Sequence, residues 1–185
     1  MVHARTTTRG RGGGENGGAR LAALVTDYFA APTDALAATI VHQSAGPSTS
    51  ARGSGEPLFD TVRLPSVEPF VMLGRLAEQL LGLPYAEVTS HPRHGALLAG
   101  DDHGPWVVTV SEDLVTALAA TSPARLAEIA RHWSRGRARG AHEPEALAAA
   151  VPALGALADR ARSVRHTVYC WAAFPDAGVS PSRPG

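Results

Sequence analysis

Four short stretches of this chain have the composition of β-strands, and helices do not separate them one by one. They are residues 59–64, 96–99, 106–110 and 167–174. A polar turn at 101–105 joins the second stretch to the third, which predicts a β-hairpin. Successive parallel strands would each need a helical crossover. The spacing therefore predicts an α+β fold, with a small, mostly antiparallel sheet of three to four strands and helices packed mainly on one face.

Apolar residues recur at helical spacing through most of the remaining chain. The first such stripe, at positions 21, 24, 25, 28 and 29, predicts a helix over 21–29. Further helices are predicted to begin at Thr33 or Asp34, at Ser66, at Ser111, at Ser122 and at Glu145. The last of these runs to Val164, and Pro152 inside it predicts a kink or a restart.

Three segments contain too few large apolar side chains to offset the entropy of ordering them. They are an Arg/Gly-rich arm at 1–20, a linker at 43–57 and a tail at 175–185. We expect the arm and the tail to be disordered and the linker to be flexible. A single α+β domain over 21–174, with the linker inside it, remains.

Lysine is absent from the chain, so the 17 basic residues are all arginines, and 17 acidic residues balance them. Walker A loops, protein kinases and Schiff-base enzymes all need a lysine, so these classes are excluded. The balanced charge excludes a polyelectrolyte that coats nucleic acid or membrane. Residues 12–17 match the dinucleotide-binding pattern G-x-G-x-x-G, but no buried strand precedes them. We therefore expect no cofactor.

Membrane insertion and secretion are not predicted either. The longest apolar run, 146–158, contains a proline and a glycine, and it is shorter than the roughly 18 residues that a bilayer requires. Residues 1–20 lack the apolar core of a secretory signal. Cys170 is the only cysteine, so no disulfide within the chain and no cysteine-based metal site is expected. These features predict a cytoplasmic protein without a membrane partner.

Potential metal ligands are densest around the predicted hairpin. They are His91, His94, Asp101, Asp102 and His103. At about 3.3 Å per residue along a strand, His103 in the turn lies roughly 20 Å or more from His94, too far for one ion. We predict no metal site and interpret these residues as surface-turn residues. A site of His91 and His94 with Glu112 or Asp113 stays open as an alternative.

The last predicted strand carries the candidate pocket or interaction residues, which are His166, Tyr169, Cys170 and Trp171. Alternation along a strand predicts that Tyr169 and Trp171 face away from Cys170. His166 and Cys170 share a face but lie about 13 Å apart, too far for a catalytic thiolate–imidazolium pair. A lone cysteine in an apolar strand is usually a small buried side chain. We therefore assign no catalytic residue.

An arginine-rich segment forms a second candidate site. Its members are Arg131, Arg135, Arg137 and Arg139. No acidic residue interrupts it, so it could contact phosphates or another polyanion. Arginines also collect at helix C-termini because the helix dipole favours them there, and this simpler interpretation is preferred.

A series of short motifs resembles a set of actinobacterial proteins without an assigned activity. The motifs are DYFAAPTD at 27–34, FDTVRL at 59–64, VTVSEDLVTAL at 108–118 and YCW at 169–171. The resemblance extends over about 21–174. A more distant one is to the YfbM-like domain of unknown function. It implies a small cytoplasmic protein and transfers no catalytic residue.

These observations predict a non-enzymatic module that binds another protein, as an accessory or immunity-like protein does. One alternative is a small hydrolase or transferase that uses histidines and Cys170, and a second is a weak nucleic-acid or polyanion binder. An enzyme should bring two of the reactive side chains within about 4 Å beside a pocket. The candidates are His91, His94, His132, His166 and Cys170. A binding module should instead expose an apolar patch.

Overall fold

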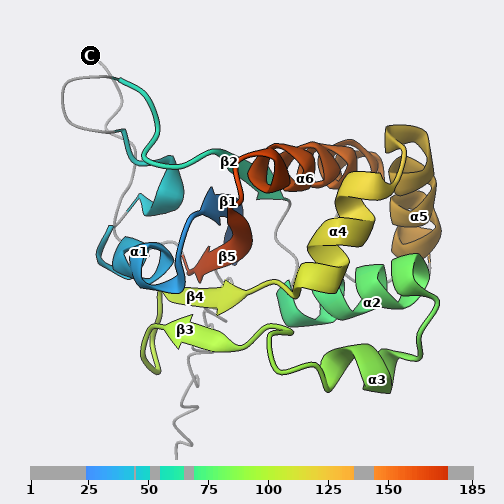
Figure 1. Ribbon diagram of the computed structural model, residues 1–185, viewed down its shortest axis with the longest axis horizontal. Coiled ribbons are helices and arrows are strands. Elements are labelled where there is room, and N and C mark those ends of the chain that lie inside the picture. Colours follow the sequence, from blue (N-terminus) through green and yellow to red (C-terminus); the bar gives the residue numbers. More distant parts are fainter. Residues whose placement is uncertain (1–23, 44, 51–54, 65–68, 136–143, 175–185) are drawn as a thin grey trace, which may run out of the picture.

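The computed structural model describes residues 24–43, 45–50, 55–64, 69–135 and 144–174. In these ranges the chain forms one antiparallel sheet with helices on both faces (Figure 1). The strands are β1 (Val25–Ala31), β2 (Thr61–Leu64), β3 (Leu97–Ala99), β4 (Trp106–Thr109) and β5 (Thr167–Ala173). The α-helices are α1 (Asp34–Ala38), α2 (Pro69–Leu81), α3 (Tyr85–Thr89), α4 (Glu112–Ala120), α5 (Pro123–Arg135) and α6 (Pro144–Ser163). Two 3-10 helices, η1 (Thr39–His42) and η2 (Gly46–Ser48), follow α1.

The α+β class and the antiparallel sheet are confirmed, but the sheet has five strands, not three to four. The additional strand is β1, at a place where the spacing of apolar residues predicts a helix. In the order β2-β1-β5-β4-β3, β1 lies between two other strands. All its residues from Thr26 to Ala31 are buried, so both faces are covered and its apolar residues need not alternate. The apolar residues of this segment, which Thr26 and Asp27 interrupt, fit a helical stripe as well as a doubly buried strand. The structure shows the strand, so the predicted helix is wrong.

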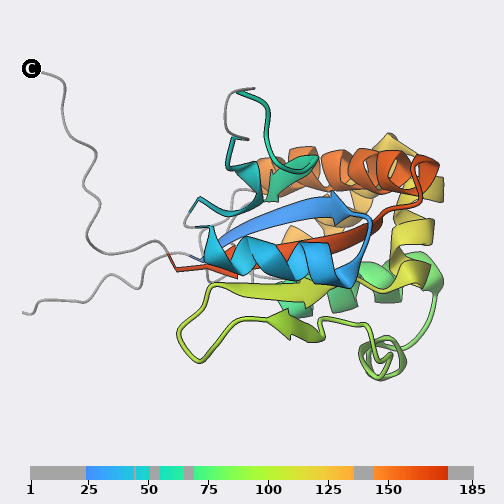
Figure 2. The ribbon, with the colours of Figure 1, turned by 60° about the vertical axis from the view of Figure 1, so that its left-hand side comes forward.

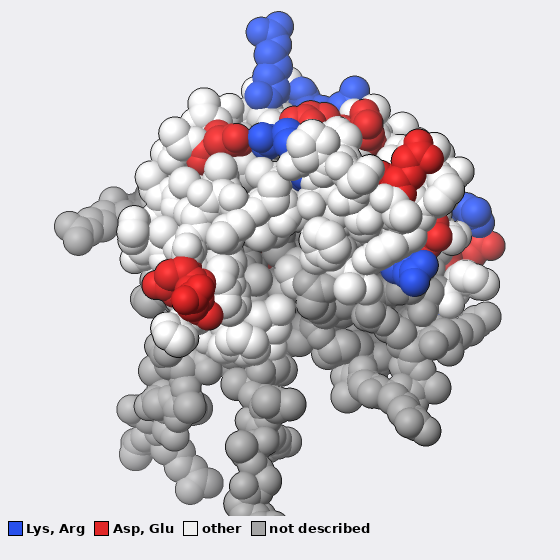
Figure 3. All heavy atoms as spheres, turned by 90° about the horizontal axis from the view of Figure 1, so that it is seen from below, with Lys and Arg blue, Asp and Glu red and all other residues white. Residues whose placement is uncertain are grey.

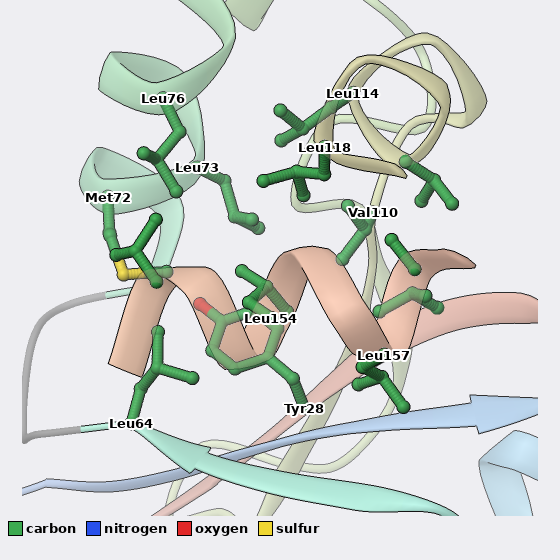
Figure 4. Close-up of a cluster of buried hydrophobic side chains, with 14 of the residues drawn as sticks. Tyr28, Leu64, Met72, Leu73, Leu76, Val110, Leu114, Leu118, Leu154 and Leu157 are labelled. Atoms are coloured by element: carbon green, nitrogen blue, oxygen red, sulfur yellow. The ribbon is translucent and has the colours of Figure 1, made fainter. Parts of the chain in front are cut away.

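The larger core lies between one sheet face and helices α2, α4, α5 and α6. Figure 4 shows the ring of Tyr28 extending from the sheet toward leucines of these helices. The fully buried leucines of this core are Leu73, Leu76, Leu114, Leu118, Leu126, Leu154 and Leu157. Burial of each contributes about 2 kcal/mol to folding. This layer is the main source of stability.

Helix α6 is continuous through Pro152, so the alternative of a restart at this proline is excluded. The helix packs tightly on α5 because it carries a glycine at the crossing. A Cβ at Gly155 would collide with the side chain of Leu126. Close helix contact therefore depends on this glycine.

The second face of the sheet is covered by α1, η1 and η2 (Figure 2). Its core contains Phe29, Ile40, Tyr169 and Trp171. The described part of the predicted linker 43–57 includes η2, which packs on this face. Gly46 in η2 has φ +66°, and a Cβ there would lie 2.9 Å from the ring of Trp171. Residues 44 and 51–54, like the predicted arm and tail, lie outside the described residues.

An ion pair between a buried carboxylate and a mostly exposed arginine lies on the same face. The side chain of Asp27 is 0% exposed, and Arg63 on the neighbouring strand donates to it from Nε at 2.7 Å and from Nη2 at 2.9 Å. The two residues are direct cross-strand partners in the β1–β2 register. A fully buried carboxylate needs such a partner, because an unpaired charge in the interior is very costly.

Local signals predict several other features correctly. Thr33 caps α1 by accepting a hydrogen bond from the Leu36 N–H at 3.2 Å, and β3 pairs with β4 as the predicted hairpin. Gly82 ends α2 with φ +67°. The predicted cap Ser66 lies outside the described residues. No helix in the described part of the chain has the length and apolar composition that crossing a bilayer requires.

Candidate functional site

Segments from distant parts of the sequence meet at one end of the sheet. Because β1 and β5 are antiparallel, Ala31 at the end of β1 pairs with Thr167 at the start of β5. The end of β4 lies at the same level, where Thr109 pairs with Tyr169. Figure 2 shows the arrowhead of β1 and the turn from α6 into β5 at this end. Side chains from α1, α4, α6 and the approach to β2 therefore come together here.

An open pocket of about 370 Å³, which we call the sheet-end pocket, lies at this end. Its walls come from the end of β1, from α1, from residues 58–60 and from the last turn of α6 with the turn that follows. Three of its apolar side chains are unusually exposed: Leu36 at 43%, Leu58 at 43% and Val164 at 59%. The pocket thus combines concave shape with exposed apolar surface, which is typical of binding sites.

One wall of the sheet-end pocket is an ion pair between Asp60 and Arg160. Arg160 donates from Nε to Asp60 Oδ2 at 2.7 Å and from Nη2 to Oδ1 at 2.8 Å. The hydrogen bond with Asp60 raises the pKa of Arg160 above its ordinary value. This geometry leaves Nη1 of Arg160 without a hydrogen-bond partner among the described residues.

The turn after α6, which forms another wall, is a Schellman motif. The His166 N–H donates to the Ala161 carbonyl at 2.8 Å, and the Arg165 N–H donates to the Arg162 carbonyl at 3.1 Å. Arg165 occupies the left-handed position of this motif with φ +59°. Glycine usually fills that position. Arg165 is the only described residue other than glycine with positive φ.

A cluster of charged and polar side chains connects four elements beside the pocket. Arg93 donates to both oxygens of Asp34, at 2.9 and 3.0 Å, and its Nε lies 3.0 Å from Glu112 Oε1 as an ionic contact without a hydrogen bond. Tyr169 Oη donates to Asp34 Oδ1 at 2.7 Å. We call Asp34, Arg93, Glu112 and Tyr169 the Arg93 cluster. It ties α1, the turn before β3, α4 and β5 together.

The pKa values in the Arg93 cluster favour a fixed charge pattern. Burial raises the pKa of Tyr169 to about 12, and its hydrogen bond with Asp34 acts in the same direction. The hydrogen bond from Arg93 lowers the pKa of Asp34, and the same bond raises the pKa of Arg93. At neutral pH the carboxylate and the guanidinium are therefore charged and the phenol is neutral. The cluster is built to hold its shape and is not poised to transfer a proton.

A second pocket of about 140 Å³ adjoins this cluster. It is lined by Glu112, Val115, Thr116, Arg162, His166 and Thr167. His166 thus lines both pockets and is itself half-buried. Of the candidate site residues that the sequence predicts, His166 is therefore the best placed to contact a bound molecule.

The four residues predicted from the last strand do not form one site. Cys170 is 0% exposed in the larger core, whereas Tyr169 and Trp171 lie in the core on the other face, which confirms the predicted alternation. The Cys170 thiol is enclosed by apolar side chains, so no substrate can reach it as the structure stands. Trp171 Nε1 is buried without a hydrogen-bond partner in the described part of the chain.

The histidines near the hairpin have structural contacts. His94 is only 4% exposed, with Nε2 3.3 Å from the Phe70 carbonyl and its ring edge-on to Phe70, so its interpretation as a surface-turn residue is wrong. His91 Nδ1 accepts the N–H of Arg93 at 3.1 Å. Asp101 accepts the N–H of His103 at 2.9 Å, an ordinary turn contact. Within the described ranges, no three His, Cys, Asp or Glu side chains are grouped so that they could hold a metal ion.

The predicted polyanion segment is described only in part. Arg131 is exposed on α5. Arg135 ends that helix, and Arg137 and Arg139 lie outside the described residues. On the face drawn in Figure 3, basic and acidic side chains lie next to one another and do not form a patch of one sign. Polyanion binding through this segment stays a prediction.

Sequence patterns do not identify most of the residues of the sheet-end pocket. Leu58 lies between the predicted linker, which ends at residue 57, and the predicted strand, which begins at residue 59. Val164 is interpreted as the last residue of the predicted helix. Asp60 and Arg160 are 100 positions apart. A partial signal exists in the basic residues at the end of α6, but the same pattern also stabilises the helix dipole.

Comparisons with known proteins leave the chain without an assigned family. No protein-family model matches it, and no curated protein or solved structure is significantly similar to it. The resemblance to YfbM-like domains therefore stays a prediction.

Proposed function

We propose that this chain is a non-enzymatic module of the cytoplasm that binds another protein through the sheet-end pocket. The observation that supports this most is the convergence of three exposed apolar side chains from three separate segments. Leu36, Leu58 and Val164 are each more than 40% exposed and line the same concavity. Isolated exposed apolar residues are common on protein surfaces, but their gathering around a pocket is typical of an interaction site.

The contacts that cross this end of the sheet also support a binding role. The Arg93 cluster links α1 to β5, and the ion pair between Asp60 and Arg160 links the segment before β2 to α6. A preformed pocket loses less conformational entropy when it binds than a flexible one does. The single, buried cysteine is compatible with the reducing conditions of the cytoplasm.

The alternative of a hydrolase or transferase has less support. Cys170 lies in the larger core, and His94 lies against Phe70. His166 lines both pockets described above. Among the described residues, it forms no nucleophile–base pair with its polar neighbours there.

A capture experiment with matched variants tests the proposal. The wild-type protein, Val164→Asp and Leu97→Asp are immobilised, and the proteins retained from a lysate of the source organism are quantified by mass spectrometry. Leu97 is the control because its exposure of 60% matches the 59% of Val164, yet it does not line the pocket.

The proposal predicts a protein that is retained by the wild type and Leu97→Asp and depleted about tenfold or more with Val164→Asp. The same ranking should then hold with that protein in purified form. Equal retention by all three proteins, or the absence of any retained protein, would contradict the proposal.

A further inference from the structure

Basic side chains lie at one side of the sheet-end pocket. Arg160 and His166 belong to its wall. Arg165 lies in the turn that follows α6, next to His166 in the sequence, and Arg162 in the last turn lines the adjoining second pocket. Neither of these two arginines forms an ion pair in the part of the chain that the structure describes. An apolar pocket by itself has no need of these arginines.

The acidic groups nearby neutralise this charge only in part. Asp60 uses both oxygens on Arg160, and Glu112 pairs with Arg93. Asp159 is the remaining carboxylate of the turn and is exposed. Since Arg165 forms no ion pair among the described residues and Arg160 keeps Nη1 unused, the balance beside the pocket favours an anionic partner group.

The backbone at Arg165 gives independent support. Its φ of +59° is strained for any residue with a Cβ, and a glycine would relieve the strain at this position. Residues held in such conformations concentrate at binding sites, where the side chain serves a purpose. Arg165 is exposed and lies between Val164 and His166, which both line the pocket, although Arg165 itself does not line it.

The size of the pocket restricts what can enter. Its volume of about 370 Å³ is near the lower end of the usual range for ligand pockets. A pocket of this size can hold one large side chain, whereas binding of a helix face needs room for several side chains. Because Arg160 and His166 are themselves walls of the pocket, the anionic group must lie directly beside the apolar one. A C-terminal residue has both groups on the same Cα atom.

We propose that the sheet-end pocket binds the C-terminal residue of a partner protein, with the α-carboxylate directed to Arg160, Arg165 and His166. The side chain of that residue is large and apolar, and it contacts Leu36, Leu58 and Val164. Arg160 offers its Nη1 amine, which Asp60 leaves unused. This inference rests on the proposed function and specifies the chemistry of the partner.

Short fluorescein-labelled peptides of glycine and serine that end in leucine, phenylalanine or alanine provide the test. Each is made with a free carboxylate and as the C-terminal amide, and binding to the full chain is followed by fluorescence anisotropy. We expect the leucine or phenylalanine acid to bind, and its amide and the alanine acid to bind about tenfold more weakly. Equal affinity of acid and amide would overturn the proposal, as would the absence of binding at about 1 mM.

Three variants separate a binding role from a structural one. Val164→Asp should abolish peptide binding, and Leu97→Asp should leave it unchanged. Arg165→Gly should lower the affinity for the acid peptide about three- to tenfold and leave the affinity for the amide peptide unchanged. The variant should also be at least as stable to unfolding as the wild type. If Arg165→Gly binds the acid peptide with unchanged affinity, Arg165 does not contact the carboxylate, and the argument from charge is refuted.

Octanoate supplies an apolar carboxylate that is not a chain end. If octanoate binds and no peptide acid does, the assignment to a protein terminus is overturned.

Failure of this inference can be distinguished from failure of the proposed function. A captured partner that depends on Val164 but binds as well after its C-terminus is extended would refute only this inference, whereas a partner indifferent to Val164→Asp would refute the proposed function.

Discussion

The buried phenol of Tyr169 makes a sharp prediction about pH and stability. Its side chain is 1% exposed and donates to Asp34 at 2.7 Å. Tyr169→Phe removes that hydrogen bond, whose acceptor is ionised but about 45% exposed and still paired with Arg93. No buried group is left unpaired, so we expect a loss of about 1 kcal/mol in the free energy of unfolding at neutral pH.

At alkaline pH the order of stability should reverse. The pKa of Tyr169 is about 12 in the folded protein, against an ordinary value of 10.0. A raised pKa in the folded state stabilises the protein below pH 10, and this contribution is lost as the pH rises toward 12. The whole contribution is about 3 kcal/mol, and about half of it is lost by pH 11. Because the phenylalanine of the Tyr169→Phe variant cannot ionise, the two stability curves should cross between about pH 10 and 11.

Urea unfolding of both proteins at about pH 8, 10 and 11, followed by tryptophan fluorescence, measures this difference. The other tyrosines and the arginines occur in both proteins, so their titration cancels. A difference between wild type and Tyr169→Phe that stays constant from about pH 8 to 11 would refute the assignment of a buried, hydrogen-bonded phenol.

Three further variants test other parts of the structure. Arg63→Ala removes the charged partner of the buried Asp27 carboxylate, which keeps, among the described residues, only the Ser48 hydroxyl at 3.4 Å. Because Arg63 is itself 62% exposed, we expect the free energy of unfolding to fall by about 1–2 kcal/mol in urea titrations, and an unchanged value would contradict the pairing. Gly46→Ala places a Cβ against the ring of Trp171 at φ +66°, and a cost of about 2 kcal/mol in thermal unfolding is expected, with an unchanged Tm as the contradicting result. Arg165→Gly should raise stability by about 0.5–1 kcal/mol by calorimetry, because the left-handed strain exceeds the extra chain entropy of glycine, and a decrease would show that φ is not positive there.

How much of the fold follows from the sequence depends on how local each signal is. The cap at Thr33, the end of α2 at Gly82 and the β3–β4 hairpin are fixed within a few residues, and all were predictable. Strand β1 was not, because burial of both its faces removes the alternation that distinguishes a strand from a helix. The strand count changes with that one element.

The site was much less predictable, because its contacts join residues far apart in sequence. Arg93 and Asp34 are 59 positions apart, Arg160 and Asp60 are 100 apart, and Tyr169 and Asp34 are 135 apart. No periodicity or spacing rule connects such pairs. The sequence predicts the opposite orientations of neighbouring side chains in β5, but only the antiparallel register brings His166 to the pocket.

The affinity of the purified partner for three forms of the chain tests the central claim most directly. Titration calorimetry compares the wild type with Val164→Asp and Leu97→Asp. A charge placed among the apolar side chains of the sheet-end pocket should weaken binding about tenfold or more, since a buried valine contributes about 1.5 kcal/mol or more. Leu97→Asp should bind like the wild type. Three affinities that agree within about twofold would contradict the account.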